Sequence, residues 1–306
     1  MIRHIENLFL AVFIFLFSSV LQAAAYPVPS PNQSLIGAVQ YTRAESTDNV
    51  VTIAKRYDIG FNAMEGANPQ LDMSKGFPVG STVLLATQHL LPDISRTGII
   101  INLPEMRMYY FPEGSNQVLT YPIGIGKIGK TIPITKTSVV RKVVNPTWVP
   151  TKNIREFNLE QGIVLPRVMP PGPDNPLGPY AIYMRIPTYL IHSTIFPESV
   201  GKRASFGCIR MYESDIEDFF PSVTKNIPVA IVNSPVKVDW QNDRLYAEAH
   251  PPLEEHDDSY DSSLPGIVHQ INNKVKDRPV LVDWQMVSYI AEEQDGLPHE
   301  VGMVIR

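Results

Sequence analysis

The sequence predicts a mainly β protein with short helices, of the α+β class. Short runs of β-branched and aromatic residues, separated by turn residues, recur between residues 98 and 232. Proline is frequent, with 28 residues, whereas tryptophan occurs three times, which is typical of a fold rich in strands and loops. A chain of 306 residues is long enough for about two domains and for a hydrophobic core of its own.

Composition excludes several classes of function. Asp and Glu number 31 against 26 Lys and Arg, so the formal net charge is −5. Nucleic-acid binding and attachment to anionic lipid by charge both need a basic face, so neither is expected. The single cysteine, Cys208, excludes an intramolecular disulfide and a cysteine-based zinc or iron–sulfur site. We expect neither a metal nor another cofactor.

Residues 1–25 predict an export signal. Arg3 lies in a short polar start, an apolar run of about 14 residues follows, and Ala23-Ala24-Ala25 is typical of a signal peptidase site. The run is shorter than the roughly 20 residues that a membrane-spanning helix needs. We therefore expect cleavage after Ala25 or slightly earlier, and a mature protein without a transmembrane segment in an oxidising compartment.

Two segments precede the strand-rich region. Residues 26–38 are rich in proline and predict an extended linker. Residues 39–88 predict a compact unit of strand, helix, helix and strand. The strands are expected over residues 39–43 and 83–86, and the helices over residues 50–57, capped by Asp48 or Asn49, and 61–66.

Strands are expected throughout the following region, over residues 98–103, 107–111, 118–123, 138–144, 180–186 and 229–232. Residues 124–130 nearly match the glycine fingerprint of a dinucleotide site. The spacing is one residue short and Pro133 prevents the helix that should follow, so this site is rejected. Residues 169–179 hold five prolines and two glycines, and we expect a stiff loop there at the rim of a cleft.

The last part of the chain, residues 234–306, is treated as a C-terminal extension without an assigned role. Residues 254–261 are acidic and predict a solvated loop, not a metal site. Asp283 is expected to cap a helix over residues 284–293, which Gly296 ends.

The surroundings of Cys208 indicate chemistry. His192 lies 16 residues upstream, at the end of a strand expected over residues 189–191. A free thiol has a pKa of about 8.5, so it needs a base to react at neutral pH, and histidine is suited to that role. Gly207 would let the N–H groups of Gly207 and Cys208 approach an oxyanion. From the residues alone, acyl transfer and a buried thiol beside a core histidine both remain open.

His192-Ser-Thr followed by Ser205-x-Gly207-Cys208-Ile-Arg210 resembles the active-site signature of L,D-transpeptidases with a YkuD-type catalytic domain, enzymes that remodel bacterial peptidoglycan. Residues 121–127, 146–150 and 172–178 fit the same family. The resemblance implies a β-sandwich-like YkuD-type catalytic domain over residues 96–233. It is strongest for Gram-negative periplasmic enzymes that cross-link stem peptides or attach an outer-membrane lipoprotein to them, which implies a periplasmic location.

Residues 39–88 resemble a LysM module, a small βααβ fold that binds glycan strands. Tyr41, the helix over residues 51–57, Asn68-Pro69 and Gly80 carry the resemblance. Residues 45–48 depart from it, because the family usually has a Gly-Asp turn there. A small helical cap without affinity for glycan remains the alternative.

The family resemblance implies a mechanism. His192 removes the proton of Cys208, while a backbone carbonyl near Ser193 orients the imidazole. Cys208 attacks the carbonyl before the terminal D-Ala of a tetrapeptide stem, the N–H groups of Gly207 and Cys208 bind the oxyanion, and D-Ala leaves. The thioester then passes to an amine of another stem peptide, which gives a 3-3 crosslink, or of a lipoprotein.

Neighbouring residues have expected supporting roles. Arg210 is expected to bind a substrate carboxylate or to form a structural ion pair beneath the site. Ser205 is expected to hydrogen-bond the loop that carries Cys208 or only to form its turn. Phe206 stands where the family often has His, and because Phe cannot share a proton, the polarity of the site departs from the family pattern. The expected oxyanion- or substrate-binding residues are Ser193, Ser205, Gly207 and Arg210.

Two other functions remain as alternatives. One is a non-catalytic peptidoglycan-binding protein, in which Phe206 marks a decayed active site. The other is a cysteine L,D-carboxypeptidase or amidase, which passes the same thioester to water. Intact His192 and Cys208 disfavour the first, and the shape of the cleft decides the second.

Overall fold

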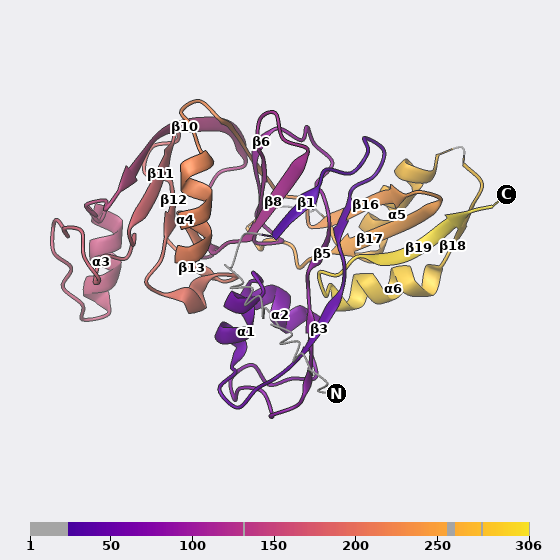
Figure 1. The fold of residues 1–306 in the computed structure, drawn as a ribbon, viewed down its shortest axis with the longest axis horizontal. Helices are drawn as coiled ribbons and strands as arrows, with labels where there is room; N and C mark the ends of the chain where they lie inside the picture. Colours follow the sequence, from indigo (N-terminus) through magenta and orange to yellow (C-terminus); the bar gives the residue numbers. More distant parts are fainter. Residues whose placement is uncertain (1–23, 131, 256–260, 277, 306) are drawn as a thin grey trace, which may run out of the picture.

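A nine-stranded sheet forms the centre of the part of the chain that the structure, a computed structural model, describes: residues 24–130, 132–255, 261–276 and 278–305 (Figure 1). The strand order is β1-β8-β7-β6-β15-β10-β11-β12-β14. Their bounds are β1 (Ala24–Pro27), β6 (Gly98–Asn102), β7 (Arg107–Phe111), β8 (Gln117–Pro122), β10 (Thr135–Val144), β11 (Tyr180–Met184), β12 (Leu190–Ser193), β14 (Ile209–Met211) and β15 (Pro228–Val232). The strands expected between residues 98 and 232 are confirmed, as is the mainly β class.

Short helices flank this sheet: α1 (Val50–Arg56), α2 (Phe61–Ala67), α3 (Lys152–Glu160), α4 (Glu213–Ser222), α5 (Leu264–Val275) and α6 (Trp284–Glu293). Among the described residues, no helix combines the length and the apolar character that crossing a bilayer requires. The expected signal peptide lies outside the described residues, apart from Ala24 and Ala25.

Strand β10 divides the sheet into two halves. Residues 135–138 pair with β15 and residues 139–144 pair with β11, and the register shifts after Val139. Both halves contribute to one buried core, for example Ile101 from β6 and Ile191 from β12. A strand that changes partners in this way lets two layers face each other, as in a sandwich. This geometry agrees with the β-sandwich-like arrangement expected for residues 96–233.

The expected βααβ unit is present. Strands β3 (Gln40–Arg43) and β4 (Thr82–Leu85) pair antiparallel, and α1 and α2 lie between them in the chain. The Asn49 side chain accepts hydrogen bonds from the N–H groups of Val51 and Thr52, which caps α1 as predicted. Backbone bonds from Phe61 and Asn62 to residues 200 and 201 join this helical unit to the central body, as does the Tyr212 hydroxyl, which donates to the Ile59 carbonyl at 3.1 Å.

The segment expected to be a linker, residues 26–38, is part of the folded body. Tyr26 and Pro27 belong to β1, which pairs with β8, and β2 (Leu35–Gly37) pairs with β5 (Gln88–Leu90). The chain turns at residues 30–33, and its extended parts on either side bond to neighbouring strands, so the segment is not a free linker.

The C-terminal extension folds into a unit of its own. Its sheet has the order β16-β17-β19-β18, with β16 (Val236–Gln241), β17 (Arg244–Ala249), β18 (Val280–Val282) and β19 (His299–Val304), and α5 and α6 pack on it (Figure 1). Asp283 caps α6 as predicted. The extension also supplies Leu253 to the core of the nine-stranded sheet and Leu297 to the core of the helical unit.

Buried charges fix the extension to the central sheet. The Lys237 ammonium lies 2.9 Å from Glu105, which precedes β7, and 2.5 Å from Glu248 on β17. His89 approaches the same two carboxylates, and the ligand atoms of the three residues lie within 4.8 Å of one another. Because both carboxylates already pair with the Lys237 ammonium, this cluster is an ion-pair network rather than a built metal site.

Candidate active site

Neighbouring strands bring Cys208, His192 and Arg210 together. Strands β12 and β14 are parallel, and their register sets His192 opposite Arg210. Cys208 directly precedes β14 and lies two residues before Arg210. All three residues line one cavity of about 800 Å³. The fold therefore brings together the pair that the sequence singled out.

His192 is held as a neutral base. It is buried, with 3% of its surface exposed, and its Nδ1 hydrogen-bonds the backbone carbonyl of Ser193. Since a carbonyl only accepts, Nδ1 carries the proton and Nε2 is left as an acceptor. Burial, and then the charge of Arg210, lower the pKa of His192 to about 4. The carbonyl expected near Ser193 is thus the one that orients the ring.

Cys208 is held as a thiol. Its Sγ lies 3.7 Å from the carbonyl oxygen of Thr188, to which it donates. Burial raises the pKa of the Cys208 thiol, although the Leu190 N–H and the charge of Arg210 act in the opposite direction. Burial therefore favours the neutral forms of Cys208 and His192, which line the same cavity.

Ser205 organises the loop before Cys208. Its hydroxyl donates to the Cys208 carbonyl at 2.6 Å and accepts from the Gly207 N–H at 3.0 Å. Ser205 was expected either to hydrogen-bond the loop that carries Cys208 or only to form its turn. The structure shows the hydrogen bonds. The expected use of the Gly207 N–H for an oxyanion needs correction, because that N–H is already bonded to Ser205.

Gly207 has another reason to be glycine. Its φ is +108°, a value that residues with a side chain rarely adopt. A Cβ atom at this position would meet the ring of Tyr189 and lie 2.9 Å from the carbonyl oxygen of Lys130. The absence of a side chain allows the loop to pack against Tyr189.

Ser193 does not face the cavity, which corrects its expected place among the substrate-binding residues. Its side chain is fully buried, and its Oγ donates to the Leu177 carbonyl at 2.9 Å and accepts from the Tyr180 N–H at 3.2 Å. Leu177 belongs to the proline-rich loop 169–179, which has no helix or strand and lines the cavity, as expected. Ser193 therefore anchors the loop at the rim.

Arg210 directs a positive charge at the cavity. Its Nε is buried without a hydrogen-bond partner in the described part of the chain, and its guanidinium forms no ion pair there. Burial lowers the pKa of Arg210, while Cys208 and Glu198 act in the opposite direction. The expected structural ion pair is absent from the described residues, and the side chain is free to meet a carboxylate.

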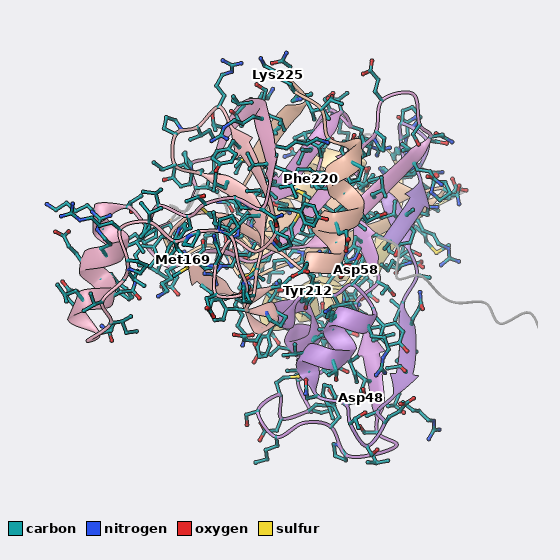
Figure 2. The ribbon with its side chains drawn as sticks, turned by 60° about the vertical axis from the view of Figure 1, so that its left-hand side comes forward. Asp48, Asp58, Met169, Tyr212, Phe220 and Lys225 are labelled. Carbon is teal, nitrogen blue, oxygen red and sulfur yellow. The ribbon has the colours of Figure 1, made fainter. Side chains whose placement is uncertain are left out.

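Helix α3 forms a wall of the cavity that the sequence reasoning missed. Its Phe157 ring packs edge to face on Phe206, with centroids 5.1 Å apart, and Lys127 Nζ lies 4.4 Å from the centre of the Phe157 ring. No residue of α3 is buried, and the helix projects from the body beside Met169 (Figure 2). The sequence signal that could have predicted the start of α3 was Thr151, whose side chain accepts from the Ile154 N–H and caps the helix.

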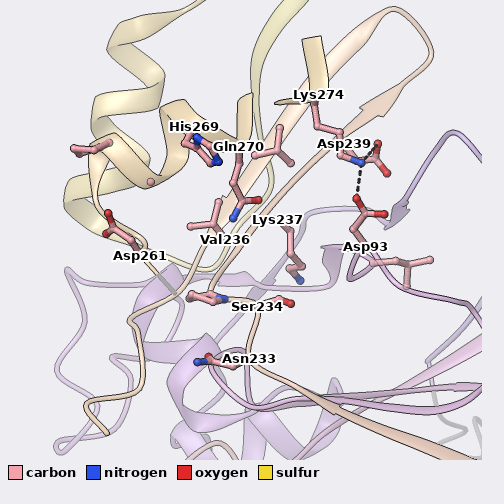
Figure 3. A pocket seen from close by; sticks show the side chains of 15 residues that line it. Asp93, Asn233, Ser234, Val236, Lys237, Asp239, Asp261, His269, Gln270 and Lys274 are labelled. Atoms are coloured by element: carbon pink, nitrogen blue, oxygen red, sulfur yellow. Dashed lines mark hydrogen bonds and ion pairs between the residues drawn. The ribbon is translucent and has the colours of Figure 1, made fainter. Parts of the chain in front are cut away.

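A second cavity, of about 520 Å³, lies between the C-terminal unit and the central sheet (Figure 3). Lys274 reaches across it to Asp93 at 3.0 Å and Asp239 at 3.3 Å. Neither Cys208 nor His192 lines it. Because the expected nucleophile and base both line the first cavity, that cavity is the candidate active site.

Comparison with known proteins defines the class. Residues 96–238 match the YkuD family, described as the L,D-transpeptidase catalytic domain. The chain is 41% identical to the probable L,D-transpeptidase YcfS of Escherichia coli K12 over 250 residues, which cover 80% of this chain and 78% of YcfS. It is 40% identical to the probable L,D-transpeptidase YbiS of the same organism over 256 residues, or 81% and 82% of the two chains.

The chain therefore belongs to the L,D-transpeptidase family and is an enzyme of that class. Among solved structures, the chain is similar to the catalytic domain of the E. faecium L,D-transpeptidase. The match covers 46% of this chain and 99% of that domain, at 23% identity and a TM-score of 0.35. The expected L,D-transpeptidase family and YkuD-type domain are confirmed.

Proposed function

We propose that the protein is an exported, periplasmic L,D-transpeptidase that uses Cys208 as nucleophile and His192 as general base on peptidoglycan tetrapeptide stems. The observation that carries the proposal is the joint presentation of Cys208, His192 and Arg210 on one cavity, with burial favouring a neutral His192 whose Nδ1 bonds the Ser193 carbonyl. A neutral base and a thiol suit acyl transfer, because the proton moves only as the bond forms.

The reaction has two halves. In the first, His192 Nε2 takes the thiol proton as Cys208 Sγ attacks the carbonyl before the terminal D-Ala, and the same proton is then given to the departing D-Ala amine. In the second, an acceptor amine attacks the thioester while His192 takes its proton, the bond from the carbonyl carbon to Sγ breaks, and His192 returns the proton to Cys208 Sγ. Of the two N–H groups first expected at the oxyanion, that of Cys208 is the one not bonded to Ser205.

Charge at the cavity fits a substrate with carboxylates. Arg210, Lys127, Lys130 and Lys152 line it, against the single acidic side chain of Asp174 among the lining residues. Stem peptides carry free carboxylates, which this excess of positive charge attracts. We assign Arg210 to a substrate carboxylate, because its guanidinium has no ion pair in the described residues.

The remaining assignments follow the sequence. Residues 1–25 are the signal peptide, residues 39–88 a LysM-like unit that holds glycan strands, residues 96–233 the catalytic domain and residues 234–306 an extension fixed to it. Tyr41 is 64% exposed on the LysM-like unit, as a residue that contacts a glycan must be. The acyl acceptor is an amine of a second stem peptide or of an outer-membrane lipoprotein.

The test is incubation of the mature protein with purified tetrapeptide muropeptides, with products read by mass spectrometry. We expect release of D-Ala and cross-linked dimers, and neither from Cys208→Ala at an unchanged melting temperature. A carbapenem should leave a covalent mass on the protein but not on Cys208→Ala. Cross-linked products from Cys208→Ala would overturn the nucleophile, and free tripeptide as the sole product would replace the transferase with a carboxypeptidase.

A further inference from the structure

Two acidic side chains meet where the helical unit contacts the catalytic domain. Asp58 follows α1, Asp215 lies on α4, and their carboxyl groups are in hydrogen-bond contact (Asp58 is labelled in Figure 2). Asp58 Oδ1 and Asp215 Oδ2 are buried, and apart from the opposite carboxyl group no donor among the described residues reaches them. Adjacent buried carboxylates repel each other, so such a pair needs a shared proton or a cation.

The nearby cation does not satisfy this pair. Arg107 donates from Nη1 to the Thr120 hydroxyl at 2.9 Å and from Nη2 to the backbone carbonyl of Asp58 at 3.3 Å. Neither Asp58 nor Asp215 forms an ion pair with a Lys or Arg side chain in the described part of the chain. Burial raises the pKa of both carboxyl groups, and the neighbouring Asp58 adds to the rise at Asp215.

The backbone nitrogen of Ala24 also contacts this pair of carboxyl groups. Ala24 N–H donates to Asp58 Oδ2 at 3.3 Å. Its position is set by the sheet, because Ala24 opens β1 and pairs with Thr120 on β8. A small cavity of about 170 Å³ is lined by Ala24, Asp58 and Asp215 together, which leaves room for a larger donor at this nitrogen.

We propose that the export signal is cut between Ala23 and Ala24, and that the new α-ammonium of Ala24 forms a buried ion pair with Asp58 and Asp215. A signal peptidase adds water across the bond: the hydroxyl goes to the Ala23 carbonyl and a proton to the Ala24 nitrogen. The amine then takes a second proton from solvent. One amide N–H is thereby replaced by a cation with three donors, which matches the orphaned oxygens Asp58 Oδ1 and Asp215 Oδ2.

This inference rests on the proposed export and refines the site of cleavage. The small residues Ala23 and Ala25 favour a cut after Ala25. That cut would remove two of the four residues by which β1 pairs with β8, Ala24 and Ala25, and with them the donor to Asp58. A cut between Ala23 and Ala24 keeps the full pairing of β1 with β8 and the donor to Asp58. Maturation then joins the new chain end to the contact between the helical unit and the catalytic domain.

The first measurement is the intact mass of the protein exported from its full-length precursor. We expect a mature chain that begins at Ala24. A chain that begins at Tyr26 would overturn the inference and leave the proposed function in place if that sample still transfers acyl groups. A chain that keeps residues 1–23 would overturn both this inference and the proposed export, whereas the activity of Cys208 would be judged separately on muropeptides.

The second measurement is a double-mutant cycle on thermal stability. Mature protein beginning at Ala24 is compared with the same protein carrying one additional glycine before Ala24, each with and without Asp58→Asn. We expect the glycine, and Asp58→Asn, each to lower Tm by at least about 5 °C, because either change breaks a buried ion pair. The glycine should have little further effect in Asp58→Asn.

Glu217→Gln is the matched control, since Glu217 lies on the same helix as Asp215 but is exposed. In that variant the additional glycine should lower Tm as much as in the unchanged protein. An equal effect of the glycine with and without Asp58→Asn would overturn the ion pair.

Discussion

The ring of Phe206 packs edge to face on the ring of Phe157, with an interplanar angle of 75° and centroids 5.1 Å apart. This contact joins the loop that carries Cys208 to α3, a helix without a buried residue. The position where the family often has His is thus used for an aromatic contact that fixes the wall of the cavity. Its consequence for catalysis can be measured.

Phe157→Ala should loosen α3 over the active site. Because such an aromatic pair contributes about 0.5–1.5 kcal/mol, we expect kcat/KM for tetrapeptide to fall by up to about tenfold, mainly through KM. The melting temperature should barely change, since α3 adds nothing to the core. Leu159→Ala removes an exposed apolar residue of the same helix and should leave kcat/KM unchanged. An equal loss in both variants would contradict a specific role for the Phe157–Phe206 contact.

The acid limit of activity should reflect the pKa of His192 of about 4 rather than the ordinary value of 6.5. We expect kcat/KM to stay nearly constant between pH 7 and about 5 and then to fall. Arg210→Met removes one cause of the shift, so its acid limit should move to higher pH whatever its effect on substrate binding. An acid limit near 6.5 in the unchanged protein would contradict a buried neutral base.

The same shift makes stability depend on pH. Below about pH 6.5 the unfolded chain protonates His192, whereas the folded protein does not until about pH 4. Folding therefore becomes less favourable as pH falls through this window, by about 3 kcal/mol at most for this residue. Denaturant titrations between pH 7 and 4 should show a smaller loss of unfolding free energy in His192→Gln, which cannot take up the proton.

Gly207→Ala should abolish transfer. A Cβ atom combines an unfavourable φ with contacts to Tyr189 and Lys130, so the loop must move and carry Cys208 with it. We expect kcat/KM to fall at least about 100-fold, because a displacement of about 1 Å at reacting atoms has that effect. Gly114→Ala is the control, since Gly114 also has a positive φ but no neighbour within 4 Å and lies outside the cavity. An equal fall of kcat/KM in both variants would indicate that backbone strain at any such glycine, and not displacement of Cys208, causes the loss.

Tyr41→Ala should weaken retention on the cell wall without changing the chemistry. Tyr41 is exposed, and its strand belongs to the unit that resembles LysM. In sedimentation with purified peptidoglycan we expect less bound protein, and an unchanged kcat/KM on soluble muropeptides. Val144→Ala, an exposed apolar residue on β10, should sediment normally. Normal sedimentation of Tyr41→Ala would favour the alternative of a cap without affinity for glycan.

Local rules predicted much of the fold. The β-branched runs gave the strands of the central sheet, and Asn49 and Asp283 marked the starts of α1 and α6. The strands β16 and β17 were missed for a physical reason. Lys237 and Glu248 face each other across them and are buried, although their residue types indicate solvent. Lys237 is stabilised in the interior by ion pairs with Glu248 and with Glu105, and Glu105 is distant in sequence.

The candidate site was predicted in its reactive atoms but not in its hydrogen bonds. A lone thiol downstream of a histidine indicated Cys208 and His192 from the sequence. The direction of the Gly207 N–H depends on its φ of +108°, which no residue pattern specifies. The buried role of Ser193 likewise depends on the path of the loop at Leu177, which passes beside β12.

Leu253 and Leu297 belong to the C-terminal extension, yet each completes the core of an earlier unit. Neither the nine-stranded sheet nor the helical unit can close its interior until these late residues have been synthesised. Under the export proposed above, this order of synthesis keeps the earlier units incomplete while the rest of the chain is still being made. Exchanging the catalytic segment between relatives would likewise require exchanging the tail that fills its interior.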